Sequence, residues 1–291
     1  MRILVTGGAG FLGSHVADAL TEAGHKVIVF DQQNSPYLKE EQEMAVGSIL
    51  DYPLIEKLVS RSDIIYHFAG IADIDECKQR PIDTVNINIL GTVNLLESAI
   101  KANIKRFVFA SSAYVYSDAG YFYRCSKQAC EAYIETYNKL HGLEYTCLRY
   151  GSLYGPRADE RNSIFKLIKQ ALHNKKITYY GTGNEIREFI HVKDAADISV
   201  KILSDEFINE NVVLTGPEKM QYIELLSMIK EMLHDNVDIE ILPSTRDSHY
   251  KITPYNFSPK VGRKIVNNPH IDMGQGLLQC MSDIFENVII K

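Results

Sequence analysis

The sequence predicts an α/β protein built on a doubly wound parallel sheet, with a smaller α/β lobe after it. Short apolar runs alternate with helical patterns through the first half of the 291 residues. These runs are continuous instead of alternating with polar residues, which is typical of strands buried on both faces. Strands that alternate with helices form βαβ units, and the right-handed crossover rule then favours an open, doubly wound sheet.

Each element of this sheet is expected from a run of its own. The expected strands occupy residues 3–5, 26–30, 64–68, 106–110 and 145–149, and helical patterns lie at 11–23, 91–103 and 126–141. After Pro156 the alternation loosens: helices are expected at 162–172, 221–233 and 274–290, and a short strand leads into a helix over 185–203. We therefore expect a first domain over residues 1–155 and a smaller lobe over 156–291, with a segment near 186–204 returning to the first domain.

The composition excludes several classes of protein. Hydrophobic residues make up 45% and charged residues 23%, as in soluble globular chains, and no apolar run approaches the roughly 20 residues of a membrane span. The net charge of −6 and the lack of a strongly basic stretch disfavour a nucleic-acid partner. The N-terminal apolar stretch stops at Gly7, which is too short for a signal peptide. The 5 scattered cysteines form no CxxC or zinc pattern, so we expect free thiols, no metal site and a cytoplasmic location.

A glycine-rich segment joins the first expected strand to the first expected helix. Gly7, Gly10 and Gly13 form the pattern G-x-x-G-x-x-G, with Phe11 and Leu12 inside it. Such glycines allow a tight turn, a close approach of the backbone to a pyrophosphate, and close packing of the helix on the strand. The helix N-terminus adds unpaired N–H groups and a positive dipole end. An ordinary glycine-rich turn is the alternative, but the position between strand and helix favours a dinucleotide-binding loop of a Rossmann domain.

An acidic residue at the end of the second expected strand indicates which dinucleotide binds. Asp31 lies 18 positions after Gly13 (31 − 13). A carboxylate there hydrogen-bonds the adenosine ribose hydroxyls and repels a 2′-phosphate. No arginine follows in the next residues, Gln32, Gln33 and Asn34, so NAD is favoured over NADP. A solvated aspartate in a turn is the alternative.

A serine, a tyrosine and a lysine form the candidate catalytic group. Ser112 follows the expected strand 106–110, and Tyr123 and Lys127 are spaced to share one face of a helix. A nearby ammonium favours the phenolate, so Tyr123 becomes a base able to take a hydroxyl proton while a hydride leaves the same carbon. Ser112 is then placed to share the proton or orient the substrate oxygen. Y-x-x-x-K alone is a weak signal, and a tyrosine–lysine pair on a solvated helix face is the alternative.

Taken together, these motifs resemble those of a known family. Nearly the whole chain resembles the extended short-chain dehydrogenase/reductases, in the group of NAD-dependent nucleotide-sugar epimerases and dehydratases that are similar to UDP-glucose 4-epimerase. The segments that carry the resemblance are Thr6–Gly13, His67–Gly70, Asn88–Glu97, Arg106–Tyr116, Tyr123–Lys127, Leu148–Arg157 and Arg187–Asp194.

The resemblance implies roles for individual residues. It implies that NAD is bound by the glycine loop and Asp31 together with Ile49, Phe68, Ala69, Gly70, Asn88, Tyr123, Lys127 and Tyr150. Asn88 would brace the helix that carries Tyr123, and Tyr150 would sit near the nicotinamide. The substrate would be contacted by Ser112, Ser152, Arg187 and Arg246. Arginine suits bidentate contact with the diphosphate of a nucleotide sugar.

Three departures from the family pattern narrow the expected reaction. Dehydratases of this group carry Asp-Glu after the catalytic serine or threonine, whereas this chain has Ala113 and Tyr114, so 4,6-dehydration is disfavoured. Ser152 replaces a substrate-contacting asparagine. The segment between Ser112 and Tyr123 is short, so the pocket beside the sugar is expected to be open, or to be closed by Tyr114, Tyr116 or Tyr121.

The sequence therefore predicts an NAD-dependent epimerase that acts at C4 of a UDP-sugar, with UDP-N-acetylhexosamines accepted at least as well as UDP-glucose. A nucleotide-sugar C4 oxidoreductase or a 4,6-dehydratase-like enzyme is the alternative within the family. A non-catalytic NAD-sensing protein is the alternative of another class. A homodimer is expected through the helices that start near Gly91 and Ser126, although their apolar residues are equally compatible with a face packed on the sheet.

Overall fold

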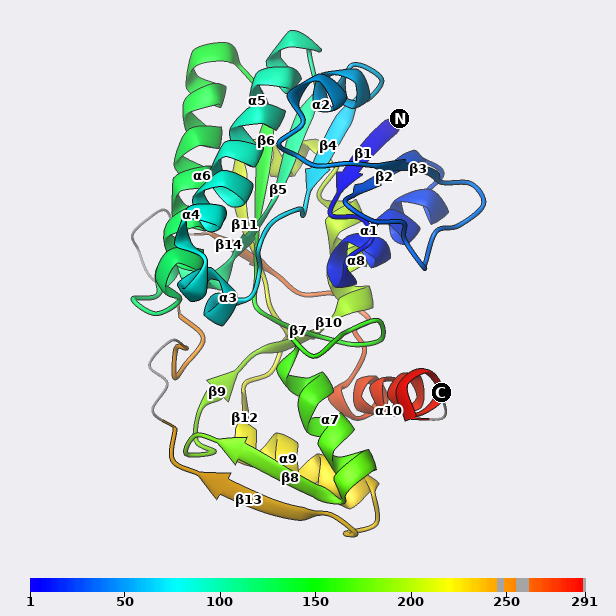
Figure 1. Ribbon diagram of the computed structural model, residues 1–291, viewed down its shortest axis with the longest axis vertical. Helices are drawn as coiled ribbons and strands as arrows, with labels where there is room; N and C mark the ends of the chain where they lie inside the picture. Colours follow the sequence, from blue (N-terminus) through cyan, green and yellow to red (C-terminus); the bar gives the residue numbers. More distant parts are fainter. Residues whose placement is uncertain (245–248, 255–261, 290–291) are drawn as a thin grey trace.

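An eight-stranded parallel sheet occupies one end of the molecule in the computed structural model, which describes residues 1–244, 249–254 and 262–289 (Figure 1). The strand order is β14-β11-β6-β5-β4-β1-β2-β3. Its strands are β1 (Arg2–Thr6), β2 (Lys26–Asp31), β3 (Glu43–Val46), β4 (Ile64–His67), β5 (Arg106–Ser112), β6 (Tyr145–Tyr150), β11 (Glu210–Leu214) and β14 (Arg263–Ile265). The order reverses between β1 and β4, and the loops after these strands meet at one edge, where α/β sheets bind ligands.

The five predicted strands are confirmed, and each is buried along nearly its whole length. The sequence analysis did not predict β3, which lies at the edge of the sheet. Its residues Glu43–Val46 are half-buried or exposed, so the continuous apolar run that reveals a central strand is missing there.

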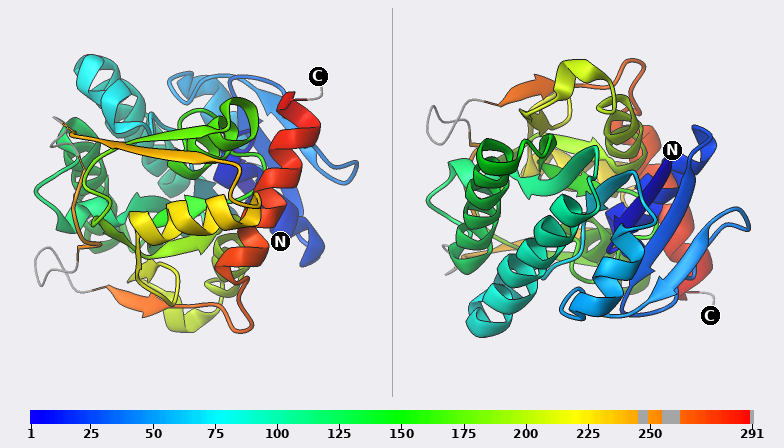
Figure 2. Two further views of the ribbon diagram at one scale, coloured as in Figure 1. Left: turned by 90° about the horizontal axis from the view of Figure 1, so that it is seen from below. Right: turned by 90° about the horizontal axis from the view of Figure 1, so that it is seen from above.

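Helices cover both faces of this sheet (Figure 2). Helices α1 (Phe11–Glu22) and α8 (Val192–Lys201) pack together on one face, over a core that includes Ile3, Val5 and Ile198. The other face carries α2 (Tyr52–Val59), α5 (Gly91–Lys101) and α6 (Tyr121–His141). Helices α3 (Ile74–Gln79) and α4 (Pro81–Thr84) and the π-helical turn η1 (Val85–Leu90) lead into α5. Among the described residues, no helix is both long and apolar enough to cross a membrane.

The smaller lobe has a separate core beneath the carboxyl edge of the sheet (Figure 1). Its helices are α7 (Ser163–Asn174), α9 (Tyr222–Met232) and α10 (Met273–Ile284), and strands β8 (Lys176–Tyr180) and β13 (Asp238–Leu242) pair in parallel. Two further pairs cross between lobe and sheet: β7 (Ser152–Tyr154) with β10 (Phe189–His191), and β9 (Ile186–Arg187) with β12 (Met220–Gln221). Single turns are η2 (Ala113–Tyr116), η3 (Asp205–Phe207) and η4 (Phe285–Ile289).

The chain passes between the two parts more than once. Beyond residue 155, α8 packs against α1, and β11 and β14 extend the large sheet beside β6. A division into residues 1–155 and 156–291 therefore stays a proposal about domains, in which segments of the second range complete the sheet of the first.

A buried ion pair ties α6 to the sheet. Glu131 accepts hydrogen bonds from Arg149, at 2.9 Å from Nε to Oε1 and 2.7 Å from Nη2 to Oε2. Ser111 donates to Glu131 Oε1 at 2.5 Å, and Arg149 also bonds the Tyr116 hydroxyl. Both Glu131 and Arg149 are almost completely buried. The pair therefore joins α6, β5, β6 and η2, and each charge depends on the other for its compensation.

This dependence predicts the outcome of a double-mutant cycle. Glu131→Leu leaves the Arg149 charge uncompensated and should lower the free energy of unfolding by about 3–5 kcal/mol. The double variant Glu131→Leu/Arg149→Met removes both charges and should lose clearly less. Chemical denaturation measures the free energy of unfolding of each variant. Lys101→Met is the control: it removes an exposed ion pair with Glu56 and should change the free energy of unfolding little. A double variant less stable than Glu131→Leu would contradict this account.

Candidate active site

The glycine-rich loop has the shape that a dinucleotide pyrophosphate requires. Gly7 adopts a left-handed φ of 70°, and its N–H bonds the Phe30 carbonyl at 2.8 Å. A Cβ on Gly13 would collide with the Gly7 carbonyl oxygen, so only glycine lets α1 pack this closely on the loop. Helix α1 begins after Gly10 without a side-chain cap, which leaves its first N–H groups available. The loop therefore fits a bound pyrophosphate.

Asp31 closes the loop from the second strand. Its Oδ2 accepts a hydrogen bond from the Ala9 N–H at 3.0 Å, and Oδ1 accepts one from the Gln32 N–H at 2.7 Å. Its half-buried carboxylate thus lies beside the glycine-rich loop. This is the position from which an acidic residue reaches the adenosine ribose.

Asn88 connects the loop after β4 to the helix that carries the candidate base. Its side chain accepts a hydrogen bond from the Ile71 N–H at 2.7 Å and donates to the Ile71 carbonyl at 3.0 Å. The same amide donates to Ser126 Oγ on α6 at 3.0 Å. A Cβ on Gly70 would meet Asn88 Oδ1 at 2.9 Å, so the chain Phe68–Gly70 passes directly over this amide. Asn88 therefore braces α6, as the sequence comparison implied.

Ile49 and Tyr150, two further residues expected to contact the cofactor, have different surroundings in the structure. Ile49 is buried against Gly91, at which a Cβ would collide with the isoleucine side chain. Tyr150 ends β6 beside Ser112 of β5, and its ring lies 6.4 Å from that of Phe68. The Tyr150 hydroxyl bonds Ser199 Oγ on α8 at 2.6 Å, so only the ring is left for contact with a cofactor.

The candidate catalytic residues come together where β5 meets α6. Tyr123 and Lys127 lie one turn apart, and the Lys127 Nζ is 5.7 Å from the centre of the Tyr123 ring. Lys127 is buried, donates to the Ala110 carbonyl at 2.7 Å and lies 4.8 Å from the centre of the Phe109 ring. Ser112 ends β5 and hydrogen-bonds the Tyr123 side chain. The structure therefore brings the predicted serine, tyrosine and lysine into one site.

Burial shifts the pKa values of both Tyr123 and Lys127. Burial raises the pKa of Tyr123 to about 12, and the hydrogen bond to Ser112 opposes the rise. Burial also lowers the pKa of Lys127, while nearby Cys130 and Cys77 oppose that shift. A phenol with so high a pKa keeps its proton at neutral pH. The raised pKa is the opposite of the lowering expected from the neighbouring Lys127, because burial of the phenol outweighs the effects that favour the phenolate.

Tyrosine side chains border the site on the side of the smaller lobe. The Tyr114 ring lies 6.1 Å from that of Tyr123 and 4.6 Å from that of Tyr250. Tyr250 is buried, and its hydroxyl bonds Ser152. Tyr114, one of the three tyrosines that the sequence offered for this side, therefore lies beside the candidate base. The sequence analysis missed Tyr250, because no motif surrounds it and its place follows from the tertiary fold.

Arg187 supplies a buried positive charge at the same side. Its guanidinium carbon lies 4.3 Å from the centre of the Tyr250 ring and 5.6 Å from that of Tyr222. It donates to the carbonyls of Ile186 and Lys251 at 2.9 and 3.3 Å. No carboxylate pairs with Arg187 among the described residues, so the site offers a charge to an anionic ligand. Arg246, the second predicted arginine, lies outside the described residues.

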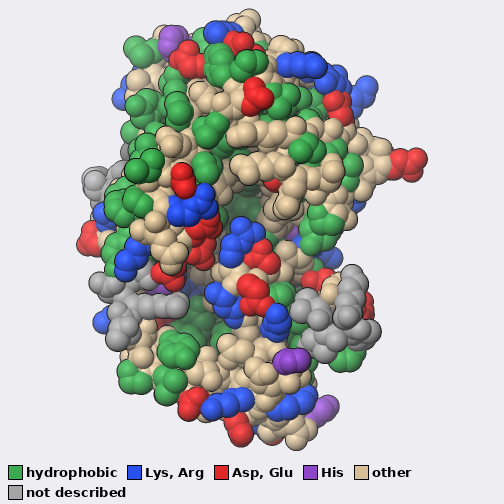
Figure 3. Space-filling model, in the orientation of Figure 1, with side chains coloured by type: hydrophobic (Ala, Val, Ile, Leu, Met, Phe, Trp, Pro, Cys, Tyr) green, Lys and Arg blue, Asp and Glu red, His purple; other side chains and the backbone are tan. Residues whose placement is uncertain are grey.

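Figure 3 shows the surface hollowed between the sheet and the smaller lobe, with charged side chains gathered at that level. Asp31 and Ser112 end strands of the sheet, the glycine loop follows β1, and Tyr123 and Lys127 lie on α6, which packs on the sheet. Ser152 and Arg187 belong to strands that cross to the lobe. The fold and the site thus define a Rossmann-type α/β protein in which the glycine-rich loop and a buried tyrosine–lysine pair lie at the carboxyl edge of one sheet.

Comparison with known proteins identifies the family. The chain belongs to the NAD-dependent epimerase/dehydratase family, whose pattern matches residues 3–214, and NAD is its cofactor. A protein of Methanocaldococcus jannaschii, provisionally named a UDP-glucose 4-epimerase, is 34% identical over 78% of this chain and 81% of its own length.

Two further relatives bear other names. A UDP-N-acetyl-alpha-D-glucosaminuronate decarboxylase of Bacillus cytotoxicus is 31% identical over 90% of this chain and 88% of its own. The solved structure of a UDP-N-acetylglucosamine 4-epimerase from Methanobrevibacter ruminantium, in complex with UDP-N-acetylmuramic acid, is 25% identical. It aligns with a TM-score of 0.84 over 100% of this chain and 99% of that one.

The place of Asp31 predicts how cofactor choice responds to mutation. Asp31→Ala removes the negative charge beside the ribose and should narrow the gap between NAD and NADP affinities, mainly by improving NADP binding. Calorimetry on cofactor-stripped protein measures both dissociation constants. Asp51→Ala is the control, because it also removes one carboxylate, but one that caps α2 by accepting a hydrogen bond from the Leu54 N–H. It should leave the gap between the two affinities unchanged. Tighter binding of NADP than NAD by the unaltered protein would overturn the assignment.

Proposed function

We propose that this protein is a UDP-sugar 4-epimerase in which Ser112, Tyr123 and Lys127 are catalytic. The observation that carries the proposal is the buried junction of β5 and α6, where Tyr123 lies against Ser112 and Lys127 on the carboxyl side of an NAD-binding sheet. The names of the relatives support the substrate class, since the compounds in them are UDP-sugars.

Each catalytic residue has a defined task in this proposal. NAD, held by the residues assigned to it below, would supply a hydride acceptor at C4 and the hydride for the return step. Tyr123 takes the C4 hydroxyl proton, so that a ketone forms at C4, and returns the proton in the second half-reaction. Ser112 hydrogen-bonds Tyr123 and holds the substrate oxygen at the same point. Lys127 keeps a positive charge beside the phenol and is fixed by the Ala110 carbonyl.

The remaining proposed contacts bind the substrate and the cofactor. Arg187 is buried and lacks a carboxylate partner among the described residues, so we assign it to the substrate diphosphate. Ser152 is assigned to the sugar, beside the Tyr250 hydroxyl. On the cofactor side, the glycine loop, Asp31, Ile49, Phe68–Gly70, Asn88 and Tyr150 are assigned to NAD.

The sugar is proposed from the walls of the site. The peptide from Ser117 to Phe122 is short, and Tyr114 borders Tyr123 in place of a longer loop. Ser152 is smaller than the asparagine expected there and leaves room for a substituent at C2. We therefore infer that UDP-N-acetylhexosamines are turned over at least as well as UDP-glucose.

A second candidate uses the same first half-reaction. A ketone at C4 of a hexuronate activates its carboxylate for loss as carbon dioxide, and a relative that is 31% identical is named a decarboxylase. Net oxidation at C4 is the third possibility within the family.

One product assay separates these outcomes. The purified enzyme is incubated without added cofactor with UDP-glucose, UDP-N-acetylglucosamine and UDP-glucuronate, and products are resolved by chromatography and mass. A C4 epimer of unchanged mass supports the proposal, whereas loss of carbon dioxide or accumulation of a ketosugar contradicts it. Bound NAD without any turnover would favour an NAD-sensing protein. A preference for UDP-glucose of tenfold or more, about 1.4 kcal/mol, would contradict only the argument about the sugar.

Substitution of the candidate base tests the chemistry. Tyr123→Phe keeps the ring but removes the proton acceptor, so kcat should fall by about 10²-fold or more while substrate affinity changes little. Tyr133→Phe is the matched control, because Tyr133 is an exposed tyrosine on the same helix. Near-full activity of Tyr123→Phe would show that another group takes the proton.

We also propose that two copies associate through α5 and α6. Leu95, Leu96 and Ala99 are completely buried against the sheet, so the interface falls to other residues. The exposed apolar side chains around these helices are Ile82, Val85, Leu90, Phe122, Tyr133 and Leu140. Figure 3 shows hydrophobic side chains over this face.

The cysteines support the expected location. All 5 cysteines are free in the structure, which supports a reducing compartment such as the cytoplasm.

The oligomeric state tests this surface. Tyr133→Glu/Leu140→Glu places charges on the face of α6 and should convert a dimer to a monomer in sedimentation experiments. Leu278→Glu, at an exposed leucine of α10, is the control expected to leave the mass unchanged. A monomeric unaltered protein at micromolar concentration would refute the proposed dimer.

A further inference from the structure

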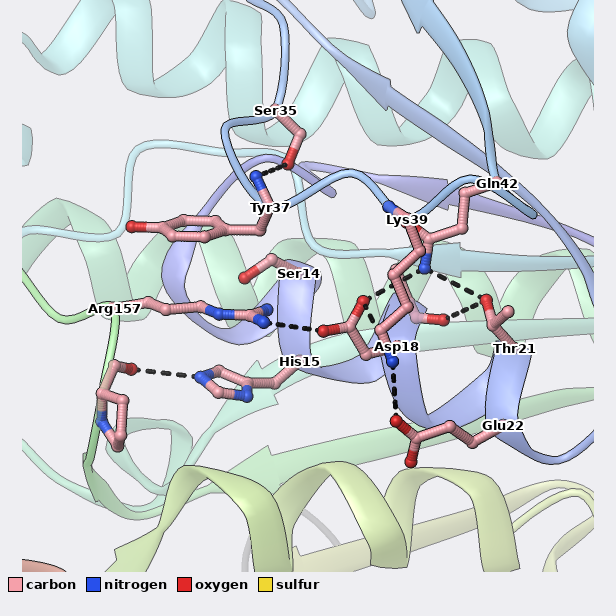
Figure 4. Close-up of polar contacts among 12 residues, drawn as sticks. Ser14, His15, Asp18, Thr21, Glu22, Ser35, Tyr37, Lys39, Gln42 and Arg157 are labelled. Atoms are coloured by element: carbon pink, nitrogen blue, oxygen red, sulfur yellow. Dashed lines mark hydrogen bonds and ion pairs between the residues drawn. The ribbon is translucent and has the colours of Figure 1, made fainter. Parts of the chain in front are cut away.

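The loop that follows Asp31 is anchored to α1 at two points (Figure 4). Residues 32–42 connect β2 to β3, and Asp31, at their start, is the residue proposed to bind the adenosine ribose. Near the end of the loop, Gln42 Nε2 donates to Asp18 Oδ1 at 3.1 Å and to Thr21 Oγ1 at 3.0 Å. Lys39 pairs with Glu22 at 2.6 Å. The end of the loop is therefore fixed to the third turn of α1.

The middle of the loop is held from the smaller lobe. Tyr37 lies on the guanidinium of Arg157, with 4.5 Å between Cζ and the centre of the ring. The same guanidinium pairs with Asp18 at 2.8 Å. Figure 4 shows Arg157 lying between the Tyr37 ring and α1. Arg157 thus fills the space between α1 and the loop of residues 32–42, which we call the ribose loop because it follows Asp31.

The backbone holds Arg157 in this position. Arg157 has a left-handed φ of 65°, which is uncommon for a residue with a side chain. Its N–H donates to Asp283 Oδ2 of α10 at 3.2 Å. The preceding carbonyl, of Pro156, accepts a hydrogen bond from His15 Nε2 on α1 at 3.1 Å. Contacts from α1 and α10 therefore fix an unusual backbone conformation, which indicates that the position of this side chain matters.

We propose that Arg157 is a positioning residue that fixes the ribose loop and so determines how tightly the adenosine half of NAD is held. Without the guanidinium, Tyr37 loses the surface on which it packs, and Asp18 loses its closest cation. The loop then keeps only its attachments at Gln42 and Lys39. The segment between Asp31 and Tyr37 is free to move away from the ribose.

The proposed reaction requires NAD to be held tightly, which is the effect that we assign to Arg157. An epimerase has no net redox change, so one cofactor molecule must stay bound from the first half-reaction to the second. Tight retention of the adenosine half supplies this condition without altering the chemistry at Tyr123. The inference rests on the proposed place of the ribose at Asp31, but its test needs no sugar nucleotide and is independent of turnover.

The experiment measures binding of NAD and of ADP to cofactor-stripped protein by calorimetry. ADP is the probe for the adenosine half, because it lacks the nicotinamide end. The variants are Arg157→Met, which removes charge and planar surface, and Arg157→Lys, which keeps a charge near Asp18 but loses the planar surface. Arg161→Ala is the matched control, since Arg161 is exposed on the same connection and, among the described residues, forms an ion pair only with its neighbour Asp159. Melting temperature and near-ultraviolet circular dichroism report whether each variant is folded.

We expect Arg157→Met to weaken NAD and ADP by the same factor, about tenfold, which corresponds to about 1.4 kcal/mol. Arg157→Lys should fall between this variant and the unaltered protein, and Arg161→Ala should match the unaltered protein. The Arg157→Met enzyme should also retain less NAD after gel filtration.

Two results would overturn the proposal. One is an NAD affinity within twofold of the unaltered protein in a folded Arg157 variant. The other is a loss of NAD affinity without a loss of ADP affinity, which would place the effect at the nicotinamide end. If Arg157→Met does not fold, Arg157→Lys decides between these outcomes by the same two titrations.

Discussion

The ion pair between Glu131 and Arg149 fixes the elements on which the proposed active site depends. Glu131 lies one helical turn after Lys127 and two turns after Tyr123, and it holds Ser111, the neighbour of Ser112. Because the carboxylate is buried, it can occupy only the place that Arg149 compensates. The ion pair thereby helps to set the register of α6 against β5, and the bond from Lys127 to the Ala110 carbonyl adds to it.

Burial in the same region sets the limits of the chemistry. It raises the pKa of Tyr123 to about 12 and lowers that of Lys127, so both shifts oppose formation of the phenolate–ammonium pair. A positive nicotinamide bound against the phenol would act in the opposite direction and favour the phenolate.

Much of this arrangement is predictable from the sequence, because its signals are local. The buried strands, the glycine loop, Asp31 and the Tyr123–Lys127 spacing depend on neighbouring residues along the chain. The edge strand β3 was not predicted, since its half-exposed residues show no apolar run. Glu131, Arg149 and Tyr250 were missed for another reason: a charge or a ring acquires its role only from partners far away in the sequence. Arg157 belongs to both groups, because a motif contains it but only the fold reveals its contact with Tyr37.

In the proposed reaction, a hydrogen leaves C4 of the sugar and returns to C4 within one site. A mixture of substrate deuterated at C4 and substrate labelled with carbon-13 but not with deuterium tests this directly, with the epimeric products analysed by mass. The account predicts that deuterium remains at C4 in the product of the deuterated molecules and does not appear in the carbon-13 product. Loss of deuterium to water, or its transfer to the carbon-13 product, would contradict it.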